Sequence, residues 1–404
     1  MAINPPHGSR FGDGSNHAPG SGPYRGTQDR CAALQGVVVI DLASYAAGPH
    51  AARYLADFGA DVIKVERPSG DPMRRIGWRA PDGDSYFWKV VGRNKRCVAL
   101  DLKTNDGIRR FRQLVDRADI LVENLRPGGL ERLGIGPDRL LEQRPNLVML
   151  RVSGYGQSGP YANLPGFATA AEGVGGYAGI SGEAGGRPLL PPLPIADETA
   201  GLAGAFAAMV ALRHAEHTGE GQVVDVNLAD VMVQLLGPLV SVCAHEGVLQ
   251  QRMGSSLPYT APRGTYPCQE GKWLALSASS DGVASRLLEL LGLGQDSRFA
   301  SGPDRLANAE ELDRIISDWT LARKQVDALK QLREADVVAA PVYTVAEILH
   351  DPHFRARSTV TTVGDTVMQG LIAALSRTPG HLRFAGRRLA ADQQLLNRYE
   401  EDRP

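Results

Sequence analysis

The chain has 404 residues, of which 43% are hydrophobic and 22% charged, and its formal net charge at pH 7 is -1. This composition is ordinary for a globular protein, and the balanced charge argues against a nucleic-acid-binding protein, which would carry a basic excess. No apolar run reaches the roughly 18 residues of a membrane span, so we expect no membrane association.

The N-terminal segment 1–33 is rich in Pro, Gly, Ser and Asn and lacks the apolar stretch of a secretory signal. We therefore expect a disordered tail there and a cytoplasmic protein. The cysteines lie far apart and form no CxxC pair, which indicates reduced thiols and no metal site. They are Cys31, Cys97, Cys243 and Cys268.

Residues 34–225 alternate between strand-like and helical segments. Apolar, β-branched runs predict strands at 36–44, 61–66, 96–102, 119–124 and 146–154. The stretches between them have helical spacing, which is typical of βαβ units. We therefore predict an α/β fold with a Rossmann-like, mostly parallel sheet in a large domain, whose ligands would bind at the carboxyl ends of the strands.

The pattern changes after residue 225. We expect a linker helix at 226–257, a smaller α+β domain at 258–345, and a return segment to the large domain at 346–404. Within the small domain, GTYPCQEGKWLALSAS predicts an antiparallel hairpin with Glu270 and Gly271 in its turn.

Three glycines after the fifth predicted strand, Gly154, Gly156 and Gly159, satisfy the pattern G-x-G-x-x-G. The dinucleotide fingerprint requires the third glycine to open a helix that holds a pyrophosphate. Here Pro160 and YANLPGF follow, which is typical of a loop. The sequence therefore does not favour a nicotinamide or flavin cofactor.

Basic residues follow several of the early predicted strands. Each is typical of a solvated surface when taken alone. Together they would line the carboxyl edge of the sheet, where an anionic, nucleotide-like ligand would bind. These residues are Arg67, Lys95, Arg96, Lys103, Arg126 and Arg132.

One acid, Asp197, stands between a Pro-rich apolar run and a run of very small residues in LLPPLPIADETAGLAGAF. Its simplest interpretation is a helix N-cap, which accepts backbone hydrogen bonds and feels the positive end of the helix dipole. A second interpretation is a carboxylate nucleophile held in a dry niche. The two are compatible, because an N-cap environment keeps a carboxylate ionised.

Six motifs, in this order, resemble the family III CoA-transferases, which include formyl-CoA transferase, carnitine CoA-transferase and the α-methylacyl-CoA racemases. The motifs are VIDLASYAAGPHAARYLADFGADVIKVERPSGDPMR, GRNKRCVALDLK, ADILVENLRPGGLERLGI, VSGYGQSGPYANLPGF, ADETAG and TGEGQVVDVNL. The resemblance implies an acyl-CoA and a carboxylic acid as substrates, with coenzyme A thioester rather than a permanently bound cofactor. It also implies an interlocked homodimer.

The resemblance places the catalytic aspartate of the family on Asp197, which would form a mixed anhydride and then an aspartyl-CoA thioester. The small residues Ala200, Gly201 and Gly204 would let the pantetheine arm approach. The CoA contacts of the family map onto Ala46, Ala47, Arg67, Leu100, Lys103, Asn124, Leu125, Arg126, Arg132, Pro165, Gly166 and Phe167.

The chain departs from the family pattern near this site. Ala46 stands where formyl-CoA transferase has Gln, and Phe167-Ala168 stands where it has Tyr-Glu. We therefore expect a less polar acceptor pocket, which favours a larger organic acid over oxalate or formate, with succinyl-CoA as a candidate donor. Glu172, one turn beyond Ala168, is either a nearby acid or a structural residue.

Two alternative functions stay open at this point. One is an acyl-CoA racemase or isomerase, against which Phe167 argues, because the racemases have His there. The other is a catalytically silent CoA-binding subunit of a heteromer, against which the retained Asp197 argues.

Overall fold

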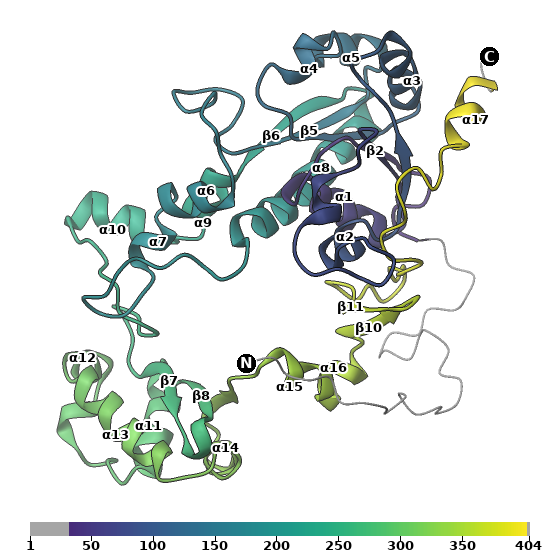
Figure 1. The fold of residues 1–404 in the computed structure, drawn as a ribbon. Coiled ribbons are helices and arrows are strands. Elements are labelled where there is room, and N and C mark those ends of the chain that lie inside the picture. The colour runs from purple at the N-terminus through teal and green to yellow at the C-terminus, as the bar shows by residue number, and fades with distance from the viewer. Residues whose placement is uncertain (1–31, 402–404) are drawn as a thin grey trace.

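The computed structural model describes residues 32–401 (Figure 1), so all but the last two residues of the predicted tail 1–33 lie outside the described part. A sheet of six parallel strands forms the centre of the large domain, in the order β3-β2-β1-β4-β5-β6. The strands are β1 (Val38–Asp41), β2 (Asp61–Glu66), β3 (Lys95–Ala99), β4 (Ile120–Glu123), β5 (Val148–Ser153) and β6 (Gln222–Asn227). The predicted α/β class and Rossmann-like sheet are confirmed.

The strand order changes direction between β1 and β4. In the register of the sheet, Ile40 lies opposite Ile63 on one side and Leu121 on the other. Such a switch point leaves a crevice at the carboxyl ends of the two strands, because the helices that follow them turn to opposite faces. A ligand is therefore expected to bind near the loops that follow β1 and β4.

Helices cover both faces of this sheet (Figure 1). On one face α1 (Ala47–Asp57) and α8 (Ile195–Thr218) share a core with Val39, Val62 and Leu150. On the other face α3 (Asn105–Val115) and α5 (Pro137–Gln143) bury Phe111 and Leu140. Shorter helices follow the strands: η1 (Pro72–Arg75), α2 (Tyr86–Val91), α4 (Gly129–Arg132), α6 (Ala168–Val174) and α7 (Tyr177–Ile180).

The small domain has its own sheet and core. Its antiparallel sheet has the order β7-β8-β9, with β7 (Arg263–Pro267), β8 (Trp273–Ser277) and β9 (Val338–Pro341). The predicted hairpin is confirmed, and its turn residues Glu270 and Gly271 have φ of 61° and 71°. The other elements are η2 (Gln269–Gly271), α11 (Asp281–Leu290), η3 (Ser297–Phe299), α12 (Gly302–Ala307), α13 (Ala309–Leu321) and α14 (Gln325–Glu334).

Two connections join the domains, which stand apart in Figure 1. The first contains α9 (Leu228–Gln234) and α10 (Leu239–Glu246), which meet at an angle of 73°. The single linker helix expected at 226–257 is therefore wrong. Helix α9 ends at Gln234, and residues 235–238 separate it from α10. Within this break Gly237 adopts a positive φ of 57°, and Pro238 cannot donate a helical hydrogen bond.

The second connection returns the chain to the large domain. It contains α15 (Val345–His350), α16 (Pro352–Ala356) and the hairpin of β10 (Val360–Val363) and β11 (Thr366–Gln369). The chain then runs along β3, where Asp392 accepts a hydrogen bond of 2.9 Å from the backbone of Cys97 and Gln393 pairs with Ala99. These contacts cover the edge of the sheet before α17 (Leu395–Glu401).

Helix α8 is long and apolar enough to cross a membrane, by length and composition alone, and it is the one unbroken helix of residues 32–401 that passes this test. No membrane-length run was expected from the sequence. Since α8 packs on α1 and on the sheet through buried alanines and glycines, we assign it to the core of the large domain.

Candidate active site

Asp197 lies at the carboxyl edge of the large sheet. Helix α8 leads into the amino end of β6, so its first turn, which contains Asp197, is at the opposite edge. Helix α1 follows β1 and therefore begins at that same edge. Helix α6 reaches it as well, since Glu172 of α6 accepts a hydrogen bond of 3.3 Å from the backbone N–H of Ala196.

Asp197 is not the N-cap of α8. The cap position is Pro194, which makes no side-chain hydrogen bond, and Asp197 is the third residue of the helix. The N-cap interpretation is therefore wrong. A carboxylate from another helix, Glu172, satisfies one of the free N–H groups of the first turn.

The carboxylate of Asp197 has no partner within residues 32–401 that the structure records by a hydrogen bond or an ion pair. Burial, and then the negative charges of Glu172 and Glu198, raise its pKa to about 6. The free energy of the ionised form is thus higher than in water, which is the condition that activates a carboxylate as a nucleophile.

Glu198, the next residue, is held by helix α1. Its Oε2 lies 2.7 Å from Nδ1 of His50 and 3.9 Å from the guanidinium of Arg53, and the hydroxyl of Tyr54 donates to it at 3.4 Å. Burial opposes ionisation, but the hydrogen bond and charge of His50 and the charge of Arg53 lower the pKa of Glu198 overall. Burial lowers the pKa of His50.

The small residues after Asp197 face helix α1. A Cβ atom added to Gly201 would lie 2.7 Å from Cβ of His50, and one added to Gly204 would lie 3.1 Å from Leu150. Ala200 is fully buried in the same core. Close packing of α8 against α1 and β5 therefore accounts for their small size, and their role in admitting the pantetheine arm stays a prediction.

The basic residues differ in their availability. Arg67, Lys103, Arg126 and Arg132 are exposed in or next to the loops after β2, β3 and β4. Lys95 and Arg96 are not free at this edge: Lys95 is buried against Asp41, and Arg96 is paired with Asp61 at the amino end of β2. The expectation that these two residues line the ligand edge is therefore wrong.

The side chains of several other predicted CoA contacts are buried or hydrogen-bonded to the backbone of nearby loops. Asn124 donates to and accepts from the backbone of Ser44, both at 2.7 Å, and so fixes the loop before α1. Leu100 and Leu125 turn into the core. Ala46 and Ala47 are buried at the start of α1.

The remaining predicted contacts, Pro165, Gly166 and Phe167, lie in the loop before α6. A Cβ atom on Gly154 would lie 2.8 Å from Cα of Gly166, so the two glycines allow this loop to pack against the end of β5. Phe167 is 63% exposed. Its ring packs edge-on against the ring of Tyr45, and the two ring centroids lie 5.7 Å apart. The two loops that flank the site therefore meet through an aromatic pair.

Sequence reasoning missed Tyr45 and the cluster of His50, Arg53 and Tyr54. Tyr45 has a positive φ of 66°, a conformation that the local sequence does not predict for a tyrosine. The spacing of His50, Arg53 and Tyr54 places them on one face of α1, and this periodicity was the available signal.

A buried network of four charges lies beneath the loop 43–49. Lys64 is 3.1 Å from Asp71 and 3.6 Å from Asp41, and Lys95 is 2.7 Å from Asp41. The network also binds the loop backbone, since Asp41 accepts from Ala43, Asp71 accepts from Tyr45, and Lys95 donates to Pro49. It holds the start of α1 in place.

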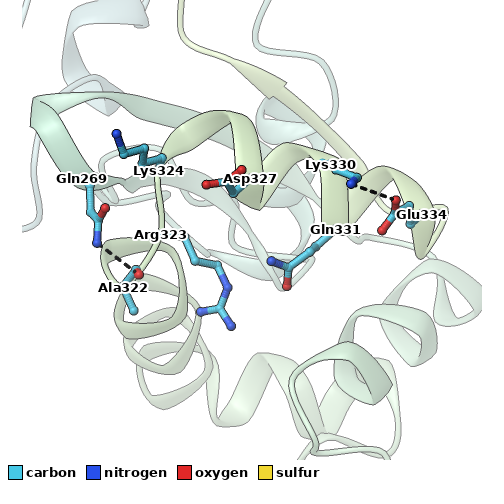
Figure 2. A pocket seen from close by; sticks show the side chains of 8 residues that line it. All are labelled: Gln269, Ala322, Arg323, Lys324, Asp327, Lys330, Gln331 and Glu334. Atoms are coloured by element: carbon cyan, nitrogen blue, oxygen red, sulfur yellow. Dashed lines mark hydrogen bonds and ion pairs between the residues drawn. The ribbon is translucent and has the colours of Figure 1, made fainter.

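A surface hollow of about 450 Å³ lies in the small domain, away from the domain of Asp197. Figure 2 shows the side chains that line it. The three cations that line it are paired or stacked: Lys324 with Glu270, Lys330 with Glu334, and Arg323 on the ring of Trp319. No group of three metal-binding side chains is found among the described residues.

Comparison with known proteins identifies the family of this chain. The profile described as CoA-transferase family III matches residues 34–392. Succinyl-CoA--D-citramalate CoA-transferase of Chloroflexus aurantiacus is 37% identical, over 87% of this chain and 90% of that protein. Succinyl-CoA--L-malate CoA-transferase beta subunit of the same organism is 38% identical, over 88% and 91% of the two chains.

The fold also has a solved counterpart. The crystal structure of a CAIB/BAIF family protein from Brucella suis matches with a TM-score of 0.82 and 31% identity, over 91% of this chain and 99% of that one. The family match, the similarity to named CoA-transferases and the shared fold agree. The chain belongs to CoA-transferase family III.

Proposed function

We propose that this CoA-transferase moves CoA from an acyl-CoA donor to a carboxylic acid through covalent intermediates on Asp197. The observation that carries this proposal is the carboxylate of Asp197 itself, which lies at the carboxyl edge of the sheet with its pKa raised to about 6 and with no counter-ion among residues 32–401. It is ionised at neutral pH and retains high nucleophilicity.

The steps conserve charge without a proton transfer. The Asp197 carboxylate attacks the thioester carbonyl, and a mixed anhydride forms as CoA leaves as a thiolate. The thiolate attacks the aspartyl carbonyl, which releases the donor acid as a carboxylate and leaves an aspartyl-CoA thioester. The acceptor carboxylate then attacks this thioester, which expels the CoA thiolate and forms a second mixed anhydride. The thiolate attacks the acceptor acyl carbonyl of this anhydride, which gives the new acyl-CoA and releases the Asp197 carboxylate.

The substrates are inferred from the relatives. The two relatives from Chloroflexus aurantiacus are named for succinyl-CoA with citramalate or malate. We infer succinyl-CoA as the donor and a short dicarboxylic acid as the acceptor. Ala46 and the exposed ring of Phe167 support a less polar site than a formate or oxalate enzyme needs.

The CoA moiety would lie along the carboxyl edge of β2, β3 and β4. The exposed cations there, Arg67, Lys103, Arg126 and Arg132, would bind its phosphates. The loop before α1 and the loop 165–167 would flank the pantetheine arm. This arrangement leads the thioester toward the first turn of α8.

We further propose that two copies of the chain form an interlocked homodimer. On the outer face of α8, Leu202, Phe206 and Val210 are 42%, 73% and 57% exposed at intervals of four residues. Helix α10 is apolar and has no buried residue. A second copy would cover both. A stable monomer at micromolar concentration in light scattering would refute the homodimer, and a requirement for a different chain would support the heteromer.

The decisive test is covalent trapping. The enzyme is incubated with succinyl-CoA and then treated with borohydride, which reduces an aspartyl thioester to an alcohol. Mass spectrometry is expected to find this change at Asp197, and activity is expected to be lost only when donor is present. Modification of another residue, or none, would refute the mechanism. Deuterium uptake at the α-carbon without CoA exchange would instead support a racemase.

A further inference from the structure

Glu172 is a buried acid beside the nucleophile that the proposed steps do not use. Its side chain comes from α6, is 3% exposed, and accepts from the N–H of Ala196 at 3.3 Å. Ala196 directly precedes Asp197, so the Glu172 carboxylate is tied to the turn that carries the nucleophile. No cation is paired with Glu172 within residues 32–401.

The two acids next to Asp197, Glu172 and Glu198, differ in the partners that offset their negative charge. Glu198 is compensated by His50, Arg53 and Tyr54 of α1. In the described part of the chain, Glu172 has one recorded partner, a neutral N–H donor, and no paired cation. A buried carboxylate in this state is unfavourable unless something offsets it. Its presence next to a reacting carboxylate points to a role in the reaction.

We propose that Glu172 is a positioning residue whose fixed negative charge destabilises the free Asp197 carboxylate and so favours the covalent aspartyl intermediates. This inference rests on the proposed function. In the anhydride and in the thioester, Asp197 carries no charge, because its negative charge has left with the CoA thiolate or with the released acid. Repulsion between the two side chains is thus present in the free enzyme and relieved in each covalent state.

The electrostatics of the site support this role. Three elements present ionisable groups here: Glu172 on α6, Glu198 on α8, and His50, Arg53 and Tyr54 on α1. After burial, the charge of Glu172 is the larger of the two electrostatic causes that raise the pKa of Asp197, and that of Glu198 is the smaller. The charge of Glu198 is moreover paired with the cation of Arg53, whereas that of Glu172 has no recorded cation within residues 32–401.

The test is the substitution Glu172→Gln, which keeps an oxygen that accepts from Ala196 and removes the charge. The fraction of enzyme carrying CoA on Asp197 is measured by intact mass at a series of succinyl-CoA to succinate ratios. The equilibrium constant for this adduct is expected to fall about tenfold, the equivalent of one pKa unit. The acidic limb of the kcat/KM profile is expected to move to lower pH.

The exposed Glu216 at the far end of α8 provides the matched control, and Glu216→Gln is expected to leave both readouts unchanged. If Glu172→Gln does not fold, the pair Glu172→Asp and Glu172→Asn repeats the comparison with a shorter side chain that differs only in charge. The inference would be overturned if removal of the charge at residue 172 changed neither the equilibrium constant of the CoA adduct nor the position of the acidic limb of the kcat/KM profile. Absence of the adduct in the unmodified enzyme would overturn the proposed function instead.

Discussion

Two groups of charged residues at the edge of the large sheet follow opposite principles. Beneath the loop 43–49, Asp41, Lys64, Asp71 and Lys95 are buried, and each lies within 3.6 Å of an opposite charge. At the start of α8, Asp197 lies beside acids, and no cation is paired with it in residues 32–401. The first group balances its charges, and the second leaves one uncompensated.

This difference distinguishes charges that stabilise the fold from a charge that serves the proposed reaction. Burial of ions is unfavourable unless each is paired and hydrogen-bonded, and the four-residue network meets this condition while it fixes the loop before α1. An unpaired carboxylate lowers stability, and such groups are found where their reactivity is used. The following predictions test this contrast, in order of decreasing effect.

The largest expected effect is on turnover. Asp197→Asn keeps the shape of the side chain but supplies an amide, which cannot form the anhydride. The transfer rate is expected to fall by at least about a thousandfold, or roughly 4 kcal/mol of activation free energy, measured as acyl-CoA exchange by mass spectrometry. Glu216→Gln on the same helix is the control. Near-normal transfer by the Asp197→Asn enzyme would show that the nucleophile lies elsewhere.

The second prediction concerns the balanced network. Asp41→Asn removes the carboxylate shared by Lys64 and Lys95 and leaves two buried cations with one acid. The free energy of unfolding is expected to fall by about 3–5 kcal/mol in urea titrations. Asp138→Asn, at an exposed position on α5, is expected to change it by less than about 0.5 kcal/mol. Equal effects of the two substitutions would mean that the network contributes nothing specific.

The third prediction concerns the stability of the nucleophile's site. The pKa of Asp197 rises from 3.8 to about 6 on folding, so the folded state binds the proton more tightly, and stability falls as the pH rises through this window. Asp197→Asn removes this effect. The variant is expected to be more stable than the unmodified enzyme by about 1–3 kcal/mol at pH 8.

The gain in stability is expected to shrink at pH 5, where the folded enzyme is largely protonated at Asp197. Thermal unfolding at the two pH values measures it. A loss of stability at pH 8 would show that Asp197 is held by favourable contacts. The kcat/KM of the unmodified enzyme is expected to fall below about pH 6, as the nucleophile becomes protonated.

The smallest expected effect is on the exposed cations. Arg67 lies in solvent after β2, and its Nε donates to the carbonyl of Gly70 at 3.1 Å. Loss of one exposed contact with a CoA phosphate by Arg67→Ala is expected to raise the KM for succinyl-CoA roughly three- to fivefold with little change in kcat. Arg314→Ala in the small domain is the control. An unchanged KM would place the cofactor away from β2.

The strands of the large sheet could be predicted from the amino-acid sequence alone. The five early strands predicted from apolar runs overlap β1 to β5, and the hairpin of β7 and β8 follows from its turn residues. These features are local, since the period of the hydrophobic pattern and the turn chemistry lie within short segments. The family motifs likewise singled out Asp197.

The tertiary structure decided the environment of that residue. The pairing of Glu172 with the first turn of α8, the compensation of Glu198 by α1, and the burial of Lys95 against Asp41 each join segments far apart in the sequence. No local pattern shows which charges meet across helices. The raised pKa of Asp197 and the close approach of α8 to α1, which requires small residues after Asp197, therefore appear only once the chain has packed.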